Sequence, residues 1–152
     1  MLQKVQSKNI HSEGDCFAIV ASKYNVRYVD AMLRAAKKEI LRAGGKVRVV
    51  RVPGAYEIPV VAARLARSQQ YAAIICLGVI FRGATTHAQH IGEAVSNALV
   101  DIQIKYEVPM IHEVLLLENQ QQGVERCLSR THNRGAEAAQ SALEMARVMA
   151  GL

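Results

Sequence analysis

Apolar and polar positions along the chain alternate in blocks that predict four β-strands. Residues 71–81 form an uncharged apolar run rich in Ile and Val, which is typical of a strand buried on both faces of a parallel sheet. Residues 46–52 alternate Val with Lys or Arg, so we expect this strand to be less deeply buried. Two further strands are predicted at 16–22 and 109–117.

Helical spacing of apolar residues follows each predicted strand. The clearest stripe runs from Val29 to Ile40 and is stopped by Gly44-Gly45. A second helix, opened by a proline, is predicted at 59–67, and others at 86–106, 119–128 and 136–150. Strands that alternate with helices favour an α/β fold, a three-layer sandwich whose four-stranded parallel sheet is covered on both faces.

The turn after the third predicted strand is the richest in chemical groups. The sequence Arg82-Gly83-Ala84-Thr85-Thr86-His87 leads into a helix that Thr85 or Thr86 is placed to cap. Free backbone N–H groups at such a helix start favour an anion, and a histidine beside them can transfer protons near neutral pH. From this pattern alone, an ordinary turn with a surface histidine is the alternative.

Three segments with polar or aromatic residues fall at predicted carboxyl ends of strands. They are Tyr24-Asn25, Ala55-Tyr56-Glu57 and residues 81–87. Ligands of open parallel sheets bind beyond these ends, so we expect the three segments to form one site. For Tyr24, Tyr56 and Phe81, packing in the core is the alternative interpretation.

Length and composition indicate a small globular protein. The 152 residues are most simply one domain over 16–152, preceded by a polar, flexible arm over 1–15 that lacks the apolar centre of a secretory signal. No apolar stretch approaches the roughly 20 residues that span a bilayer, so no membrane partner is expected. The odd set Cys16, Cys76 and Cys127 favours reduced thiols in a cytoplasmic protein.

The charge balance points to anionic small molecules. A net charge of +6 favours anionic partners, but the chain has no basic run and no Trp, so nucleic acid is not expected. His90 lies one turn after His87, which is the spacing of a metal pair. Because His11, His112 and His132 show no supporting spacing, we expect no metal.

Several segments, in this order, resemble the lumazine synthase family, which makes 6,7-dimethyl-8-ribityllumazine in the penultimate step of riboflavin biosynthesis. They read AIVASKYN at 18–25, VPGAYEIP at 52–59, RGATTH at 82–87, ER at 125–126 and GAEAA at 135–139. The resemblance implies a flavodoxin-like α/β sandwich. It also implies a transferase that needs no cofactor and condenses 5-amino-6-(D-ribitylamino)uracil with 3,4-dihydroxy-2-butanone 4-phosphate, releasing phosphate and water.

The resemblance also implies a role for each residue of the expected site. His87 falls on the family's acid–base residue. Tyr24 falls on the aromatic that stacks on the pyrimidine, and Glu57 can accept hydrogen bonds from ribityl hydroxyls. The remaining substrate positions are Asn25, Ala55, Tyr56, Val79, Ile80, Phe81 and His112. Phosphate would be held by Ala84, Thr85 and Arg126, and the guanidinium of Arg126 can bind phosphate in a bidentate manner. From the sequence alone, a solvated salt bridge between Arg126 and Glu125 is the alternative.

Departures from the family pattern surround the second substrate and the subunit contact. Ala88 and Gln89 stand where the family has an aromatic and an acidic residue, so His87 is expected to be a weaker base unless Glu93 or Glu125 comes close. His112 stands where the family has a phenylalanine that a neighbouring subunit contributes.

The resemblance also implies that copies of the chain assemble. Family members form homopentamers, some of them icosahedral shells of twelve pentamers, with active sites between subunits; riboflavin synthase is a candidate partner. The alternative function is a weakly active protein of the same fold that binds flavin or lumazine or forms a shell.

Overall fold

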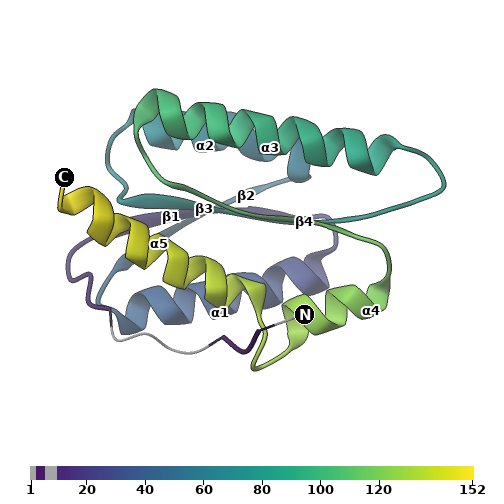
Figure 1. Ribbon diagram of the computed structural model, residues 1–152, viewed down its shortest axis with the longest axis horizontal. Helices are drawn as coiled ribbons and strands as arrows, with labels where there is room; N and C mark the ends of the chain where they lie inside the picture. Colours follow the sequence, from purple (N-terminus) through teal and green to yellow (C-terminus); the bar gives the residue numbers. More distant parts are fainter. Residues whose placement is uncertain (1–2, 6–9) are drawn as a thin grey trace.

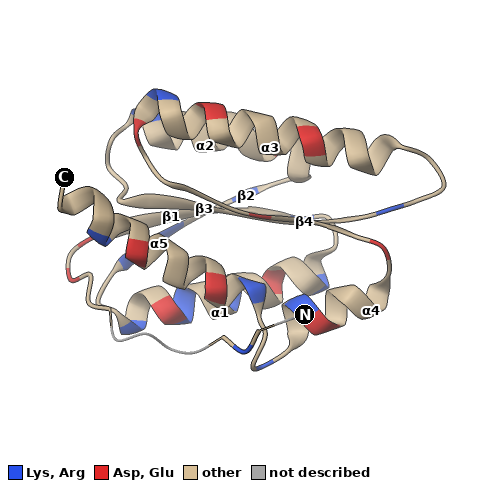
Figure 2. Cartoon of the chain, viewed as in Figure 1, with Lys and Arg blue, Asp and Glu red and all other residues tan. Residues whose placement is uncertain are grey.

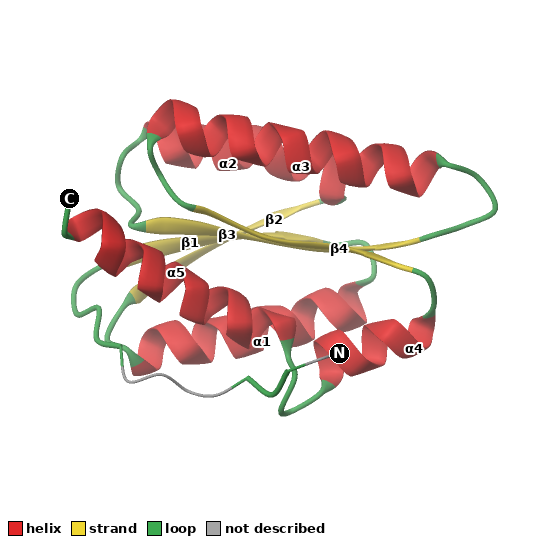
Figure 3. Cartoon of the chain, in the orientation of Figure 1, coloured by secondary structure: helices red, strands yellow, loops and turns green. Residues whose placement is uncertain are grey.

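The computed structural model describes residues 3–5 and 10–152, and its fold is a sheet between two layers of helices (Figure 1). The described residues form four strands: β1 (Cys16–Ser22), β2 (Lys46–Val52), β3 (Ala73–Phe81) and β4 (Met110–Leu117). The longer helices are α1 (Val26–Arg42), α2 (Ile58–Arg67), α3 (His87–Tyr106) and α5 (Arg134–Ala150). The short α4 (Gln120–Gly123) completes the set (Figure 3).

The sheet is fully parallel, with strand order β2-β1-β3-β4. The predicted α/β sandwich with a four-stranded parallel sheet is therefore confirmed. After β2 the chain crosses to the other side of β1, so the strand order reverses between β1 and β3. In doubly wound sheets the crevice at this switch point is where ligands bind.

Two apolar cores lie on opposite faces of the sheet, because successive strand residues point to opposite sides. Phe17 and Ile19 of β1 face α1 and α5, together with Ile75 of β3. Ala18 and Val20 face α2 and α3. Residues 17–21 and 73–77 are completely buried, whereas β2 is only partly buried, as its alternating sequence predicts.

The observed boundaries differ slightly from the sequence prediction. β3 begins at Ala73 instead of residue 71, and β4 begins at Met110 instead of residue 109. Helix α5 begins two residues earlier than predicted, at Arg134. The reason is that the buried side chain of Asn133 accepts from the N–H groups of Gly135 and Ala136 and caps the helix. The helix predicted over 119–128 is a single α-turn followed by a π-helical segment, Val124–Leu128. The expected end of α1 at Gly44 is confirmed, with φ +86° at this glycine.

The arm over 1–15 and the single domain over 16–152 stay predictions. Residues 1–2 and 6–9 of the arm lie outside the described residues. Of the rest, the Val5 N–H donates to the Thr131 carbonyl at 2.7 Å, and the N–H of the buried Ser12 donates to the Ala43 carbonyl at 2.8 Å. These bonds fasten both points of the arm to the α1 and α5 side of the domain.

Candidate active site

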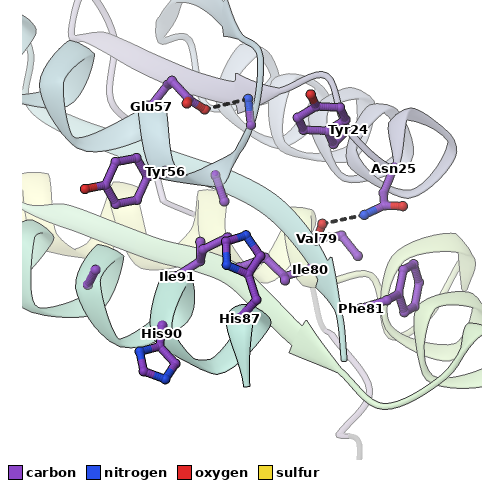
Figure 4. A pocket seen from close by; sticks show the side chains of 13 residues that line it. Tyr24, Asn25, Tyr56, Glu57, Val79, Ile80, Phe81, His87, His90 and Ile91 are labelled. Atoms are coloured by element: carbon purple, nitrogen blue, oxygen red, sulfur yellow. Dashed lines mark hydrogen bonds between the residues drawn. The ribbon is translucent and has the colours of Figure 1, made fainter. Parts of the chain in front are cut away.

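A pocket of about 860 Å³ opens at the carboxyl ends of β1, β2 and β3, next to the switch point (Figure 4). This volume suits a small-molecule site. The segment after β1, the turn after β2, the last residues of β3 and the first two turns of α3 supply its wall. The lining residues are Tyr24, Asn25, Gly54, Ala55, Tyr56, Glu57, Val79, Ile80, Phe81, His87, His90, Ile91 and Ala94.

Asn25 ties one wall of this pocket to another. It precedes α1 with a left-handed backbone, φ 57°, a conformation that asparagine tolerates better than most residues. Its Nδ2 donates to the carbonyl oxygen of Val79 at 2.7 Å, which links the end of β1 to β3. Tyr24, held by a bond from its N–H to the Pro53 carbonyl, is 70% exposed and therefore free to stack against a ligand.

Glu57 is held on the same side of the pocket as Tyr24 by its own turn. Pro53-Gly54 ends β2, and residues Ala55–Glu57 form one 3-10 turn that continues into α2. The Oε2 atom of Glu57 accepts from the Gly54 N–H at 2.9 Å (Figure 4). Gly54 leaves room for both side chains, because an added Cβ would lie 2.9 Å from the Tyr24 ring and 3.0 Å from that Oε2 atom and would displace them. The Oε1 atom makes no bond to another described residue, so it can accept from a ligand hydroxyl.

The β3 part of the wall is apolar. Val79 is buried, and Ile80 and Phe81 are partly buried at the end of the strand. The Phe81 ring packs edge-on against the Tyr28 ring, with centroids 5.5 Å apart, so Tyr28 fixes the orientation of the Phe81 ring. This apolar wall opposite Tyr24 suits the flat face of an aromatic ring system.

His87 begins α3 and faces the pocket. Thr86 occupies the cap position but its side chain makes no capping bond, whereas Thr85 Oγ1 accepts weakly from the His87 N–H at 3.4 Å. The His87 ring has no hydrogen-bond partner among the described residues. Figure 4 shows it rising toward Tyr56 and Ile91, while the His90 ring, one turn later, is turned away from them.

The carboxylates that sequence reasoning considered as partners of His87 are engaged elsewhere. Glu93 accepts from Gln89 Nε2 at 2.9 Å, and both line a different hollow between α3 and β4. Glu125 accepts from Gln121 at 3.0 Å and lies 3.9 Å from Arg126. The described chain therefore provides His87 with no acidic partner of its own.

Four of the predicted site residues do not line this pocket: Ala84, Thr85, His112 and Arg126. The first two lie exposed in the loop just before α3. Arg126 lies on the π-helical segment, where its guanidinium pairs weakly with Glu125. Within one chain, then, the residues predicted to bind phosphate lie outside the pocket that is lined by the residues predicted to bind the ring.

His112 is bonded to residues of its own chain. Its Nδ1 accepts from the Val114 N–H at 3.1 Å, so in the neutral ring Nε2 carries the proton and donates to Ser96 Oγ at 2.7 Å. Ser96 Oγ in turn donates to the Gly92 carbonyl at 2.8 Å. Partial burial lowers the pKa of His112 below its usual value. This chain of bonds fastens β4 to α3.

Sequence reasoning missed one buried ion pair and four lining residues, Gly54, His90, Ile91 and Ala94. Glu113 of β4 is 7% exposed and accepts from Arg134 Nε at 3.3 Å and Nη2 at 3.2 Å. Burial raises the pKa of Glu113 to about 7 despite this arginine. His90, Ile91 and Ala94 follow His87 at helical spacing, a signal that would have found them.

Fold and site together define a parallel α/β sandwich with an apolar, histidine-bearing ligand pocket at its switch point. The model of the 6,7-dimethyl-8-ribityllumazine synthase family matches residues 15–150. The chain is 38% identical to the 6,7-dimethyl-8-ribityllumazine synthase of Aquifex aeolicus over 98% of its own length and 99% of that protein. It is 37% identical to the protein of the same name from Desulfotalea psychrophila, over 95% of each chain, and 36% identical to that of Stenotrophomonas maltophilia, over 91% and 96%. The chain belongs to the lumazine synthase family.

None of the helices formed by the described residues is long and apolar enough to cross a membrane. Nor does any group of three or more His, Cys, Asp or Glu side chains among those residues have the arrangement of a metal site.

Proposed function

We propose that this chain is a 6,7-dimethyl-8-ribityllumazine synthase. It would condense 5-amino-6-(D-ribitylamino)uracil with 3,4-dihydroxy-2-butanone 4-phosphate and release 6,7-dimethyl-8-ribityllumazine, phosphate and water. The observation that carries this proposal is the pocket at the switch point. Its lining includes every residue that the family resemblance assigns to the pyrimidine and its ribityl chain except His112.

The pyrimidine would lie between Tyr24 and the apolar wall of Val79, Ile80 and Phe81. Its ribityl hydroxyls would donate to the free Oε1 atom of Glu57 and meet the backbone of Ala55 and Tyr56. This arrangement uses the exposed ring of Tyr24 and the fixed carboxylate of Glu57 as two anchors for one extended molecule.

The reaction needs several proton transfers, for which His87 is the available group. The ring amine attacks the ketone, and loss of water gives an imine; phosphate then leaves, the ring closes and a second dehydration completes the product. His87 would accept the amine proton and return a proton to a departing oxygen. Positioning of the two substrates lowers the barrier by several kcal/mol without any cofactor.

We further propose that the working unit is a homo-oligomer, a pentamer or a shell of twelve pentamers. The pocket of a single chain lacks Arg126 and His112, which supports a site between subunits, where these residues of a neighbour would meet the Ala84–Thr85 turn. Riboflavin synthase, which uses the product, is the proposed partner. The three free thiols support a reducing compartment such as the cytoplasm.

A second candidate function is a lumazine- or flavin-binding protein with weak activity. The observation that favours it is the absence, among the described residues, of a carboxylate hydrogen-bonded to the His87 ring, since Glu93 and Glu125 are engaged elsewhere. The experiment that tests the first function mixes the two substrates with the purified protein and follows lumazine fluorescence. We expect a rate well above that of the same mixture without protein; equal rates, together with tight binding of the lumazine, would establish the second function instead.

A further inference from the structure

A buried charged pair joins β4 to the start of α5, outside the pocket at the switch point. Glu113 is 7% exposed, and it faces the layer of α1 and α5, because strand residues alternate and His112 beside it faces α3. Its two carboxylate oxygens accept from Arg134 Nε at 3.3 Å and Nη2 at 3.2 Å. The third nitrogen of this guanidinium, Nη1, donates to Glu137 at 2.9 Å. All three nitrogens of the Arg134 guanidinium are thus engaged, and its side chain is held in one orientation.

Stability does not account for the burial of this pair. A buried ion pair is often no more stabilising than apolar side chains of the same volume. Apolar side chains occupy the rest of this face of β4, where Ile111, Leu115 and Leu117 pack in the core. Burial is the main reason why the pKa of Glu113 is raised to about 7, so the fold loses stability when Glu113 ionises. A carboxylate that weakens the fold when it is charged is a candidate for a functional role.

The pair lies next to the π-helical segment that carries Arg126. Cys127, the residue after Arg126, is completely buried, and burial is the main reason why its pKa is raised to about 12. The charge of Glu113 raises this pKa further, whereas Arg126 and Arg134 lower it, so all three charges lie around the Cys127 thiol. Figure 2 shows basic and acidic positions close together where the first turns of α5 pass the segment after α4.

The side chain of Asn133 fastens this segment to α5. Its Nδ2 donates to the Cys127 carbonyl at 2.7 Å, and its Oδ1 accepts from the Gly135 N–H at 2.8 Å. Arg134 is the next residue along the chain after Asn133. The bonds between Arg134 and Glu113 therefore hold the anchor of the segment against β4.

Arg126 depends on this support, because its own side chain is held only weakly. Its ion pair with Glu125 is long, at 3.9 Å, and 31% of the Arg126 side chain is exposed. A π-helical segment is rare in proteins and often occurs at a functional site. The direction of the Arg126 side chain is therefore set by the backbone of its segment, which Asn133 and the buried pair hold in place.

We propose that Glu113, acting through Arg134, is a positioning residue that holds Arg126 where it meets the phosphate of the ketone substrate. This role rests on the proposed function, in which Arg126 binds that phosphate. Arg134 has a structural task here instead of a direct contact with phosphate, because its guanidinium is already occupied by two carboxylates.

Glu113→Gln in the full-length oligomer tests this role, because the amide keeps the size of the carboxyl group and removes its charge. At pH 8, KM for the ketone and the competitive inhibition constant of inorganic phosphate should both rise about three- to tenfold. The effect is smaller than that of Arg126→Ala because the guanidinium is displaced and not removed. KM for the pyrimidine should change less than about twofold. The free energy of unfolding at pH 8 should be at least that of the wild type, since ionised Glu113 costs stability.

Arg134→Gln removes the other half of the pair and should give the same selective loss. The double variant should lose no more than either single variant, because both changes break the same contact. The matched control is Glu39→Gln, which removes a partly buried carboxylate that pairs with Arg42 in the last turn of α1. It should leave KM for the ketone and phosphate inhibition unchanged.

The pH dependence of anion binding gives a second readout. Glu113 is faced by Arg134 and Glu137 of α5 and by Cys127 and Arg126 of the π-helical segment. Sulfate is the probe, because it keeps its full negative charge between pH 5 and pH 8. As the pH falls over this range, the inhibition constant of sulfate for the wild type should approach that for Glu113→Gln, since protonation removes the same charge as the substitution. Taking the ratio of the two constants cancels the titration of other groups.

Unchanged constants at pH 8 in both single variants would overturn the proposal, as would equal losses for both substrates. So would a ratio of sulfate constants that does not vary with pH. A lower KM for the ketone in Glu113→Gln, together with a large loss in Arg134→Gln, would also overturn it, because Arg134 would then bind phosphate itself.

Titration calorimetry with inorganic phosphate keeps this role separate from the proposed chemistry. A protein that forms no lumazine, but binds phosphate through Arg126 and binds it more weakly in Glu113→Gln, would overturn the proposed function and leave the positioning role standing. A protein that forms lumazine and binds phosphate equally tightly in the wild type and in Glu113→Gln would do the reverse.

Discussion

The side-chain amide of Asn25 donates a 2.7 Å hydrogen bond to the carbonyl oxygen of Val79 and so joins the two strands on either side of the switch point. The bond fixes Tyr24, the preceding residue, relative to the apolar wall on β3. Asn25 also carries a positive φ of 57° at the start of α1. One residue thus supplies both a backbone turn and a clamp across the pocket.

Asn25→Ala should lower the free energy of unfolding by about 1–3 kcal/mol, because it removes the bond and forces alanine into a left-handed conformation. Asn25→Gly should cost less, since glycine adopts this φ without strain. Both should raise KM for the pyrimidine substrate. The control is Gln69→Ala, at another residue with φ 57° that lies outside the pocket; it should destabilise the fold and leave KM unchanged. A normal KM in both Asn25 variants would show that the clamp does not position Tyr24.

Gly135 is required by the close approach of α5 to α1. A Cβ at this residue would overlap the backbone carbonyl of Met32, which cannot move without shifting α1. Gly135→Ala should therefore cost at least about 3 kcal/mol of unfolding free energy, at or beyond the upper end of overpacking effects. Gly92→Ala is the control, because its nearest neighbour would be Leu116 at an ordinary 3.9 Å. That change, inside α3, should be neutral or stabilising by up to about 1 kcal/mol. Urea titrations of both variants measure the difference.

The buried carboxyl of Glu113 should make stability depend on pH. Its pKa is raised from 4.5 to about 7 in the folded chain, so the fold favours the protonated form. The stabilisation that comes from protonated Glu113 is fully present below about pH 4.5. As the pH rises through 7 it is lost, which lowers the free energy of unfolding by about 1–3 kcal/mol. Glu113→Gln should flatten the fall in unfolding free energy between pH 5 and pH 8.

The control for Glu113 is Glu137→Gln, which removes the exposed carboxylate that pairs with Arg134 Nη1 at 2.9 Å. It should leave most of the pH dependence in place, because burial is the main cause of the raised pKa of Glu113 and the charge of Glu137 is a smaller one. His112 acts in the opposite sense, because its lowered pKa favours the neutral ring and costs stability as the pH falls below 6.5. The difference between wild type and Glu113→Gln cancels this term. Parallel pH curves for the two proteins would contradict the assignment.

How much of this structure the sequence could predict depends on the range of the interactions involved. The uncharged run of β3, the alternation in β2 and the stop at Gly44 are local patterns, and each predicted its element. Tyr24, Glu57 and His87 could be assigned to one site because all carboxyl ends of a parallel sheet share an edge.

The missed features depend on contacts between distant segments. The pair of Glu113 and Arg134 joins residues 21 apart and arises only once β4 and α5 are packed together. The bond between His112 and Ser96 similarly depends on the position of α3 over β4. No local spacing in the sequence indicates such pairs, and a charged residue within a predicted strand is normally expected to face solvent.

Arg126→Ala should weaken use of the phosphorylated ketone much more than that of the pyrimidine. A charge-assisted bond to phosphate contributes about 1.5–3 kcal/mol, so kcat/KM for the ketone should fall roughly 10- to 150-fold. The residue is outside the pocket of its own chain, so this effect also requires the neighbouring subunit. Arg147→Ala, on α5, is the control for loss of one positive charge. Equal losses for both substrates would remove Arg126 from the phosphate site.

His87→Ala should leave measurable lumazine formation. The ring stands at the start of α3, and Glu93, the nearest carboxylate along the helix, is bonded to Gln89 instead. His87 can accept a proton there but gains no help from an acidic partner, so its contribution should be near the lower end of the roughly 10²–10⁴-fold typical of acid–base catalysis. Positioning by Tyr24, Glu57 and Arg126 should supply most of the acceleration. The measurement is kcat for His87→Ala after its fold and assembly have been verified. The comparison is His90→Ala, which also lines the pocket but whose ring points away from Tyr56 and Ile91, so its loss should matter less. Complete loss of turnover would show that the reaction depends on the histidine. An unchanged kcat would mean that solvent or substrate transfers the protons instead.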